Sequence, residues 1–246
     1  MKIIKLDAID STNSFLKDLA QDSSIEDYTI VTTKTQTSGR GQMNNSWVSE
    51  PNKNLTFSLF TRFKNLAIEH QPYLSFAVAL AIFEVLDEVS VPDLGIKWPN
   101  DILSGNKKIC GILVETTFTK QKIKNTVIGI GLNVNQKEFP EQLSNASSLV
   151  NILGKELNLD ALLTSLIENL RLKIDALEHH HFESIHQEYL EQLYKKDVPT
   201  VFRNEKTQLF FMGMIKDVST TGNLRVQLED DSIVEFGIKE ISIARA

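Results

Sequence analysis

The sequence predicts an α/β protein of two domains, with strands and helices over residues 1–196 and a small all-β domain over residues 197–246. In the first part, short apolar segments typical of strands alternate with longer segments whose apolar residues follow a helical period. From Val198 onward the apolar segments become short, and turn sequences such as Thr221-Gly222-Asn223 separate them. We therefore place the domain boundary at Lys196-Asp197.

The composition is that of an ordinary globular protein. Of the 246 residues, 41% are hydrophobic and 24% are charged, which is enough apolar material for a packed core. The net charge of −6 argues against nucleic acid as the main partner. One cysteine excludes an internal disulfide bond, and no apolar run reaches the length of a membrane span. The first residues are too few and too charged for a signal peptide, so we expect a cytoplasmic protein without a membrane partner.

The first ninety residues contain the clearest element signals. Strands are expected at residues 2–8, 29–35 and 55–59, where β-branched or alternating apolar residues gather. Ser11, Thr12 and Asn13 are typical cap residues for a short helix after the first strand. The free N–H groups of such a helix start are also a place where a polar ligand binds. A strongly apolar helix is expected from Pro72 to Val89, packed on the sheet.

The segment from Thr35 to Trp47 follows the second strand and has no apolar periodicity. Gly39 and Gly41 flank Arg40, so the backbone can approach a ligand closely while a guanidinium group faces an anion. The alternative is a surface loop in which Arg40 makes an ordinary ion pair. The loop alone does not decide between the two interpretations.

Two further polar clusters lie at the ends of apolar strands. Lys97 ends a short strand, and Pro99 makes the turn that directs Asn100 and Asp101. A lysine and an aspartate four residues apart across a turn suit a phosphate group and a Mg²⁺ ion, although such turns are also common without function. Lys108 stands at the mouth of a buried strand over residues 106–115, where the alternative is a solvated lysine.

The later segments complete the predicted fold. Gly129 and Gly131 lie on one face of a buried strand over residues 126–135, which indicates that a ligand or another strand packs there. Residues 147–196 are expected to be helical, with Asp160 as the N-cap of a helix over 162–177 and a solvated corner at His179–His181. Cys110 is expected to be a small core residue. The small domain should contain strands at 201–202, 208–215, 224–228, 233–236 and 241–243.

Taken together, these clusters closely resemble the catalytic domain of biotin–protein ligases over nearly the whole chain. The matching stretches are Ser11–Asn13, Gln36–Trp47, Lys97-Trp-Pro-Asn-Asp101, Lys108-Ile-Cys-Gly-Ile-Leu-Val-Glu115 and Gly129–Asn133. The resemblance implies a mixed sheet with flanking helices, akin to class II aminoacyl-tRNA synthetases, and a small SH3-like C-terminal barrel. It also implies that ATP and Mg²⁺ activate biotin to biotinyl-AMP, and that biotin is then transferred to a lysine of a biotin carboxyl carrier domain.

The resemblance also implies roles for individual residues. The catalytic residues would be Lys108, Arg40 and Asp101, and Asp101 would also contact Mg²⁺. The biotin site would consist of Ser11, Thr12, Asn13, Gln36, Gly39, Arg40, Gly41, Trp47 and Gly111. The nucleotide site would consist of Gln42, Lys97, Asn100, Lys108, Asn133 and, by a looser alignment, Phe236.

This chain departs from the family pattern in two respects. The family commonly has arginine and glycine where this chain has Gln42 and Asn44, which removes a cation beside the phosphate. The sequence starts at the first catalytic strand without the DNA-binding domain of bifunctional members, so a repressor role is not implied. We expect a monomer or weak homodimer. Two alternatives stay open at this point, namely a lipoate or octanoate ligase or transferase of the same fold and a non-catalytic biotin- or nucleotide-sensing module.

Overall fold

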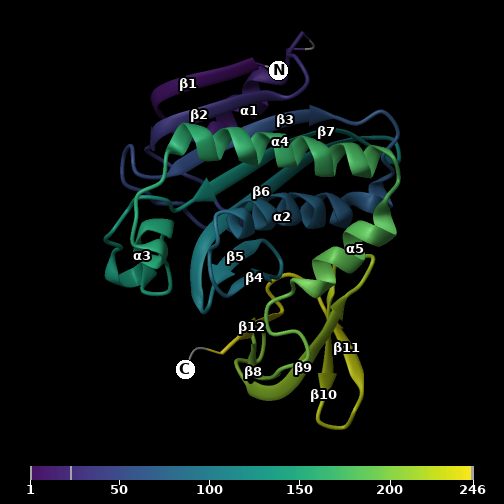
Figure 1. Ribbon diagram of the computed structural model, residues 1–246. Helices are drawn as coiled ribbons and strands as arrows, with labels where there is room; N and C mark the ends of the chain where they lie inside the picture. Colours follow the sequence, from purple (N-terminus) through teal and green to yellow (C-terminus); the bar gives the residue numbers. More distant parts are fainter. Residues whose placement is uncertain (1, 23, 245–246) are drawn as a thin grey trace.

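The computed structural model describes residues 2–22 and 24–244, which form two β-sheets and the helices packed on them (Figure 1). The larger sheet has seven strands in the order β1-β2-β3-β7-β6-β5-β4. Its strands are β1 (Lys2–Ile9), β2 (Thr29–Gln36), β3 (Leu55–Arg62), β4 (Leu94–Lys97), β5 (Asp101–Ser104), β6 (Lys107–Thr119) and β7 (Lys122–Leu132).

The larger sheet is mixed, as the family resemblance implied. Strands β1 and β2 pair in parallel, and every other neighbouring pair in this sheet is antiparallel. A parallel pair needs a crossover connection, and helix α1 (Thr12–Leu19) lies within the segment that makes it. The predicted α/β class is therefore confirmed, and α1 begins where β1 ends.

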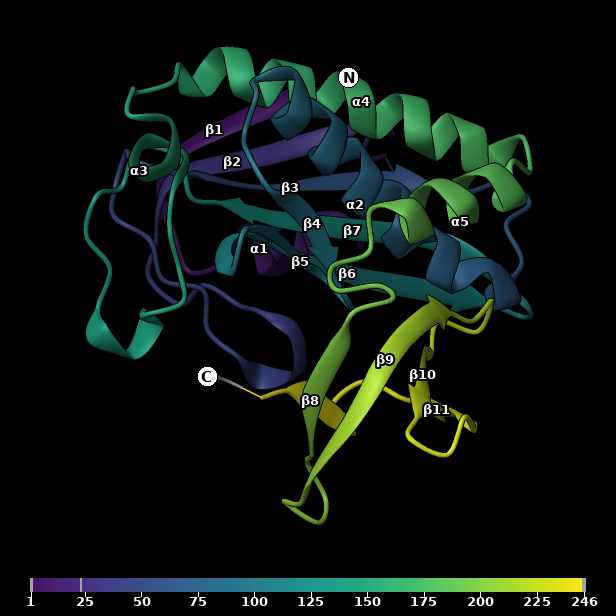
Figure 2. The same ribbon diagram turned by 60° about the horizontal axis from the view of Figure 1, so that its bottom comes forward.

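Helices cover both faces of this sheet. Helices α2 (Gln71–Glu88) and α4 (Leu159–Glu178) cross one face together, and α1 lies on the opposite face (Figures 1 and 2). Helix α2 is apolar nearly all round because it is buried between the sheet, α4 and α5 (Phe182–Glu191). On the opposite face Leu16 of α1 forms a smaller core with strand residues such as Phe60.

Strand β7 shows why the α1 face carries the candidate site. Ile128, Ile130 and Leu132 belong to the core on the α2 face. Because successive side chains of a strand point to opposite faces, Gly129 and Gly131 open toward the α1 face. The glycines thus leave a hollow in the middle of the sheet on the side where α1 and the 39–47 loop lie.

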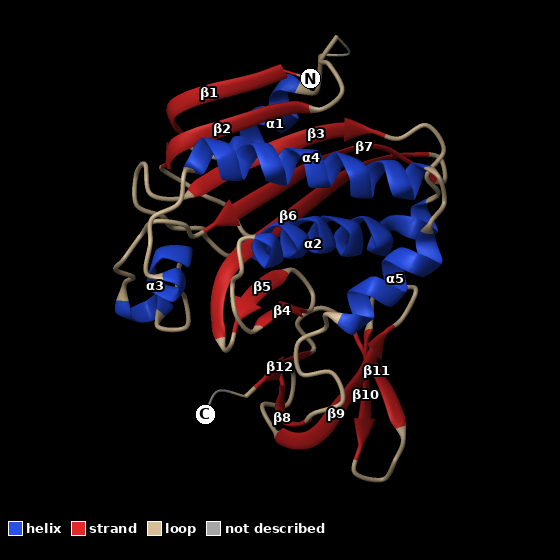
Figure 3. Cartoon of the chain, viewed as in Figure 1, coloured by secondary structure: helices blue, strands red, loops and turns tan. Residues whose placement is uncertain are grey.

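The second sheet is antiparallel and lies below α5 in Figure 3. Hydrogen bonds join it to the larger domain, among them one from Trp98 Nε1 to the Gly222 carbonyl at 2.9 Å and one between His186 Nε2 and the Val218 carbonyl at 2.6 Å. The two sheets share no strand, which supports a division near residue 196, although the boundary itself stays a prediction. Its strands, in the order β11-β10-β9-β8-β12, are β8 (Pro199–Asn204), β9 (Phe210–Val218), β10 (Leu224–Leu228), β11 (Ile233–Phe236) and β12 (Ile241–Ile243).

The helical region between the two sheets corrects one prediction. Asp160 is not the N-cap of α4, because the Asn158 side chain accepts from Ala161 N–H at 3.0 Å and the helix starts at Leu159. Asp160 lies in the first turn instead, where a carboxylate favours the helix N-terminus. A short helix, α3 (Leu149–Leu153), precedes α4. The histidines at 179–181 are exposed at the corner between α4 and α5, as predicted.

Candidate active site

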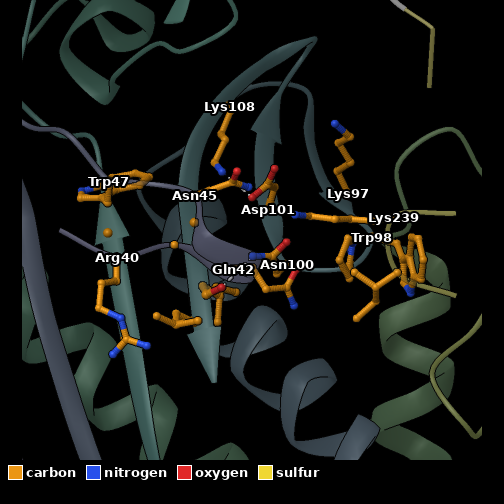
Figure 4. Close-up of a pocket in the computed structure, with 18 of the residues that line it drawn as sticks. Arg40, Gln42, Asn45, Trp47, Lys97, Trp98, Asn100, Asp101, Lys108 and Lys239 are labelled. Atoms are coloured by element: carbon orange, nitrogen blue, oxygen red, sulfur yellow. Dashed lines mark hydrogen bonds and ion pairs between the residues drawn. The ribbon is translucent and has the colours of Figure 1, made fainter. Parts of the chain in front are cut away.

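A cavity of about 630 Å³ opens on the α1 face of the larger sheet and is lined by residues of both domains (Figure 4). This volume is typical of a site for a small molecule. The larger domain contributes the start of α1 with its N-cap, the end of β2, the glycine-rich loop, part of β3, the β4–β5 turn and the middle of β6 and β7. The smaller domain that holds the second sheet, called the barrel from here on, contributes residues of β8, β9, β10 and β12 and the turn between β11 and β12.

The first turn of α1 forms a buried polar end of the cavity. Ser11 is the N-cap of α1, and its hydroxyl accepts from Ser14 N–H at 3.4 Å. Thr12 donates its backbone N–H and its hydroxyl to Gln36 Oε1, at 2.8 and 3.1 Å. Ser11, Thr12 and Asn13 are all at most 3% exposed. Such a cluster of oriented, dehydrated polar groups suits a neutral polar ligand.

Ser58 on β3 connects this cluster to the sheet. Its hydroxyl donates to Asn13 Oδ1 at 2.5 Å and lies 2.8 Å from Thr12 Oγ1. A Cβ atom at Gly129 would collide with the Asn13 side chain. Asn13 therefore occupies the space that one glycine of β7 leaves free.

Trp47 occupies the space over the second glycine. A Cβ atom at Gly131 would overlap the indole ring, and one at Gly111 would lie 3.1 Å from Trp47 Cζ3. Two side chains, Asn13 and Trp47, thus pack on the Gly129–Gly131 face. Both glycines also line the cavity, so a ligand contact at this face stays a prediction. The indole and the polar cluster lie side by side along β7.

The segment from Gly39 to Trp47 folds back on itself. Trp47 N–H donates to the Gly39 carbonyl at 2.9 Å, and Gly41 N–H donates to the Asn45 carbonyl at 2.7 Å. A Cβ atom at Gly39 would collide with the Trp47 carbonyl, so this close return of the chain requires glycine. Met43 at the tip has a left-handed φ of 53°.

Arg40 makes an ion pair outside the polar cluster. Its guanidinium donates to both oxygens of Glu115, at 2.9 and 3.3 Å, and to Ser14 Oγ at 3.2 Å. Lys17 and Asn13 also donate to Glu115. Burial alone would raise the pKa of Glu115, but the hydrogen bonds from Lys17, Asn13 and Arg40 lower that pKa below its ordinary value. The ion pair that was one of the two alternatives is thus present, and the loop also lines the cavity, whereas its contact with a ligand stays a prediction.

The β4–β5 hairpin supplies the charged end of the cavity. Lys97 and Asp101 are register partners, as are Asp101 and Gly111, so all three lie on the same face. Lys108 Nζ lies 2.6 Å from Asp101 Oδ1 and 5.8 Å from the centroid of the Trp47 ring. The Asn100 side chain donates to the Ile112 carbonyl at 2.7 Å, which fixes the hairpin on β6.

The cavity is positive although the chain is negative overall. Among the described residues that line it, two are acidic, Asp101 and Glu205. Five are basic, namely Arg40, Lys97, Lys108, Arg203 and Lys239. In a chain of net charge −6, this concentration of positive charge suits an anionic ligand.

The family model for the biotin/lipoate A/B protein ligase family matches residues 6–133, which is more than half of the chain. The chain belongs to this family. The matched region contains α1, the glycine-rich loop, the β4–β5 hairpin and the two glycine-containing strands, and so includes most of the larger domain's share of the cavity.

The names of similar proteins are consistent with membership of this family. The bifunctional ligase/repressor BirA of Bacillus spizizenii is 28% identical over 242 residues, covering 97% of this chain and 71% of that protein. BirA of Bacillus subtilis is 34% identical over 159 residues, covering 63% of this chain and 48% of that protein. The matched part thus spans about half the length of several curated relatives. A biotin protein ligase from Aquifex aeolicus, solved in complex with biotin and ATP, superimposes with a TM-score of 0.80 at 25% identity, covering 100% of this chain and 99% of that chain.

Most of the predicted site residues of this ligase-family chain line the cavity, although their roles stay predictions. The cavity brings together Ser11, Thr12, Asn13, Gln36, Arg40, Gly41, Gln42, Trp47, Lys97, Asn100, Asp101, Lys108 and Gly111. Gly39, Asn133 and Phe236 do not line it. Gly39 supports the loop from behind, Asn133 donates to the Ser147 carbonyl at 3.0 Å, and Phe236 stacks on Phe211 inside the barrel.

Three residues with prominent contacts were not predicted as site residues. Ser58 bonds the polar cluster, Glu115 holds Arg40, and Lys239 reaches the loop from the barrel. The sequence did mark Ser58 as a polar residue between Phe57 and Leu59 of a predicted strand. The structure buries it fully, and a buried hydroxyl needs a hydrogen-bonding partner. Glu115 ends the stretch Lys108–Glu115 that resembles the family, but no role was predicted for this glutamate. Lys239 had no local signal at all.

The sole cysteine takes no part in the site. Cys110 is fully buried beside the cavity wall, and burial raises the pKa of its thiol. It is a core residue, as predicted. Within residues 2–22 and 24–244, no group of three or more histidine, cysteine or acidic side chains could hold a metal ion. Over the same residues, no helix has the length and apolar content needed to cross a membrane.

Proposed function

We propose that this chain activates biotin with ATP to biotinyl-5′-AMP and transfers biotin to a lysine of a biotin carboxyl carrier domain. The observation that carries the proposal is one cavity with two chemically different ends. A buried neutral polar cluster lies at α1, and a set of lysines around one carboxylate lies at the β4–β5 hairpin. The related protein from Aquifex aeolicus, which shares this fold, binds biotin and ATP together.

The polar end suits the fused-ring head group of biotin. Ser11, Thr12, Asn13 and Gln36 supply hydroxyl and amide groups that match the donors and acceptors of a cyclic urea. The Trp47 indole offers an apolar surface next to them for the remainder of the molecule. The tail of a simple aliphatic acid such as octanoate has no donors or acceptors, so it could use none of these polar groups beyond the hydrogen bonds that they make with one another.

The charged end suits the reaction itself. A carboxylate oxygen of biotin attacks the α-phosphorus of ATP, a P–O bond forms, and the bond to pyrophosphate breaks. The acceptor lysine amine then attacks the carbonyl carbon of the mixed anhydride, an amide bond forms, and AMP leaves as the amine loses its proton. Lys108 would stabilise negative charge at the carboxylate and α-phosphate, and positioning provides the remaining acceleration.

A Mg²⁺ ion fits this site only as a partner of the nucleotide. Mg²⁺ typically takes one or two carboxylates together with substrate phosphates and water. Asp101 is the carboxylate beside Lys108, and it would supply the protein ligand. The ion would neutralise part of the triphosphate charge. We further infer that the protein acts in the cytoplasm as a monomer or weak homodimer.

Exchange of labelled pyrophosphate into ATP tests the proposal directly. We expect exchange that depends on both biotin and Mg²⁺, and a biotin mass increment on the acceptor lysine of a carboxyl carrier domain. Lipoate and octanoate at the same concentration serve as controls, because the family also contains lipoate enzymes. Exchange with octanoate or lipoate but not with biotin would contradict the proposal.

A further inference from the structure

The glycine-rich loop brings no positive charge of its own to the charged end of the cavity. Between Gly39 and Trp47 the only basic residue is Arg40. Its guanidinium is bound by Glu115 and Ser14, and Figure 4 shows the Arg40 side chain extending away from Lys108 and Asp101. The loop residue Gln42 lines the cavity but is neutral.

A cation reaches the loop from the barrel instead. Lys239 lies in the turn between β11 and β12, with a left-handed φ of 65°. Its ammonium donates to the carbonyl of Met43 at the loop tip, at 3.0 Å, and Lys239 also lines the cavity. Figure 4 shows its side chain extending into the pocket, where Asp101 and Asn100 also lie.

We propose that Lys239 binds the phosphates of the nucleotide and at the same time holds the glycine-rich loop, so that the barrel supplies the cation that the loop lacks. An ammonium group has three donors, and the Met43 carbonyl uses one of them. The other two are available to phosphate oxygens, which form strong charge-assisted hydrogen bonds. This proposal rests on the proposed function, because it takes ATP as the second substrate.

Lys108 does not make Lys239 redundant. The Lys108 ammonium is paired with Asp101 at 2.6 Å, so part of its charge is already balanced within the protein. The Lys239 side chain is anchored by a neutral carbonyl, which leaves its charge available to an anion. Nucleotide binding and loop position are therefore linked through one side chain of the barrel.

Four variants test this proposal. Lys239→Met removes the charge and the hydrogen bond but keeps the length of the side chain, whereas Lys239→Arg keeps the charge. Gln42→Arg combined with Lys239→Met places a cation on the loop itself. Lys206→Met removes an exposed charge elsewhere on the barrel and is the matched control.

We expect Lys239→Met to raise the KM for ATP about tenfold in biotin-dependent pyrophosphate exchange, the scale of one charge-assisted hydrogen bond. The KM for biotin should change less than about twofold. Lys239→Arg and the double variant should recover most of the loss, and Lys206→Met should behave as wild type. Added salt should raise the KM for ATP more in wild type than in Lys239→Met, because screening weakens an exposed charge interaction.

An unchanged KM for ATP in Lys239→Met would overturn the proposal. Equal increases in the KM values for ATP and biotin would also overturn it, since they would show that Lys239 only holds the loop in place and does not bind the phosphates. If wild type shows no exchange, the proposed function fails, and calorimetric titration with ATP alone still decides the matter. Weaker ATP binding by Lys239→Met would then support a phosphate contact, and equal binding would refute it.

Discussion

Lys108 is the residue on which the proposed chemistry depends most. Its ammonium lies between the Asp101 carboxylate and the Trp47 ring, at the charged end of the cavity. We predict that Lys108→Ala lowers the rate of pyrophosphate exchange by roughly 10²–10³, the usual effect of removing one electrostatic contact to a transition state. The fold should persist, because Lys108 is only half-buried at the start of β6. A loss below about tenfold, with an unchanged circular dichroism spectrum, would remove Lys108 from the catalytic residues.

Glu115 makes the stability of the site region depend on pH. Its side chain is 19% exposed, and its pKa is lowered because hydrogen bonds from Lys17, Asn13 and Arg40 outweigh the effect of burial. A lowered pKa stabilises the folded state above the ordinary glutamate value, and this stabilisation is lost as the pH falls through the folded-state pKa.

We therefore predict that Glu115→Gln lowers the free energy of unfolding by about 1–2 kcal/mol at pH 7, the scale of a buried hydrogen bond to a charged group. The difference from wild type should shrink when the pH falls below the ordinary glutamate pKa of about 4.3. Urea unfolding at pH 7 and at a pH below about 4.3 measures this difference in the free energy of unfolding, with Glu229→Gln as an exposed control. A difference that does not change with pH would show that the ion pairs do not cause it.

At the scale of elements, strand β7 determines how much room the site has. We predict that Gly131→Ala raises the KM for biotin at least about tenfold, because a Cβ atom there would overlap the Trp47 indole and misplace the loop. Gly237→Ala is the matched control, since its Cβ would lie 3.5 Å from the nearest atom of Glu240. The KM for biotin is measured in both variants by steady-state pyrophosphate exchange. Wild-type kinetics in Gly131→Ala would show that the indole can move without consequence.

Elements were predictable wherever local pattern decides them. The apolar period predicted α2, and turn residues between β-branched runs predicted β10, β11 and β12 with their observed bounds. Strands β8 and β9 were predicted with other bounds. The start of α4 was missed because Asn158 and Asp160 are both good caps, and only the geometry of the turn selects Asn158. Strand β5 was missed because four residues after a proline turn carry little periodicity.

At the scale of the whole molecule, ligand binding should protect both domains at once. The cavity lies between them, and Lys239 contacts Met43 across it. We predict that saturating biotin and ATP slow amide hydrogen exchange in residues 237–243 as well as in residues 39–47. Amides of β1, which lie outside the cavity, serve as the internal control. Protection confined to the larger domain would contradict a shared site.

The whole-molecule arrangement also explains where sequence-based prediction ends. Ser11, Lys97 and Lys108 could be grouped in advance because each lies at or beside one end of a predicted strand of the same sheet. Lys239 could not, because its partner Met43 is 196 residues away in the chain and no local pattern marks either residue. Phe236 was chosen as the barrel's contribution, whereas the turn residues Ile238 and Lys239 line the cavity.

Both tryptophans of the chain line this one cavity. The tryptophan fluorescence of the protein therefore originates entirely at the site and needs no added label. Trp47 emits from the loop beside the Lys108 ammonium, and Trp98 emits from the junction where its indole N–H meets the Gly222 carbonyl. Replacing Trp98 by phenylalanine would leave a protein whose tryptophan fluorescence reports on the glycine-rich loop alone.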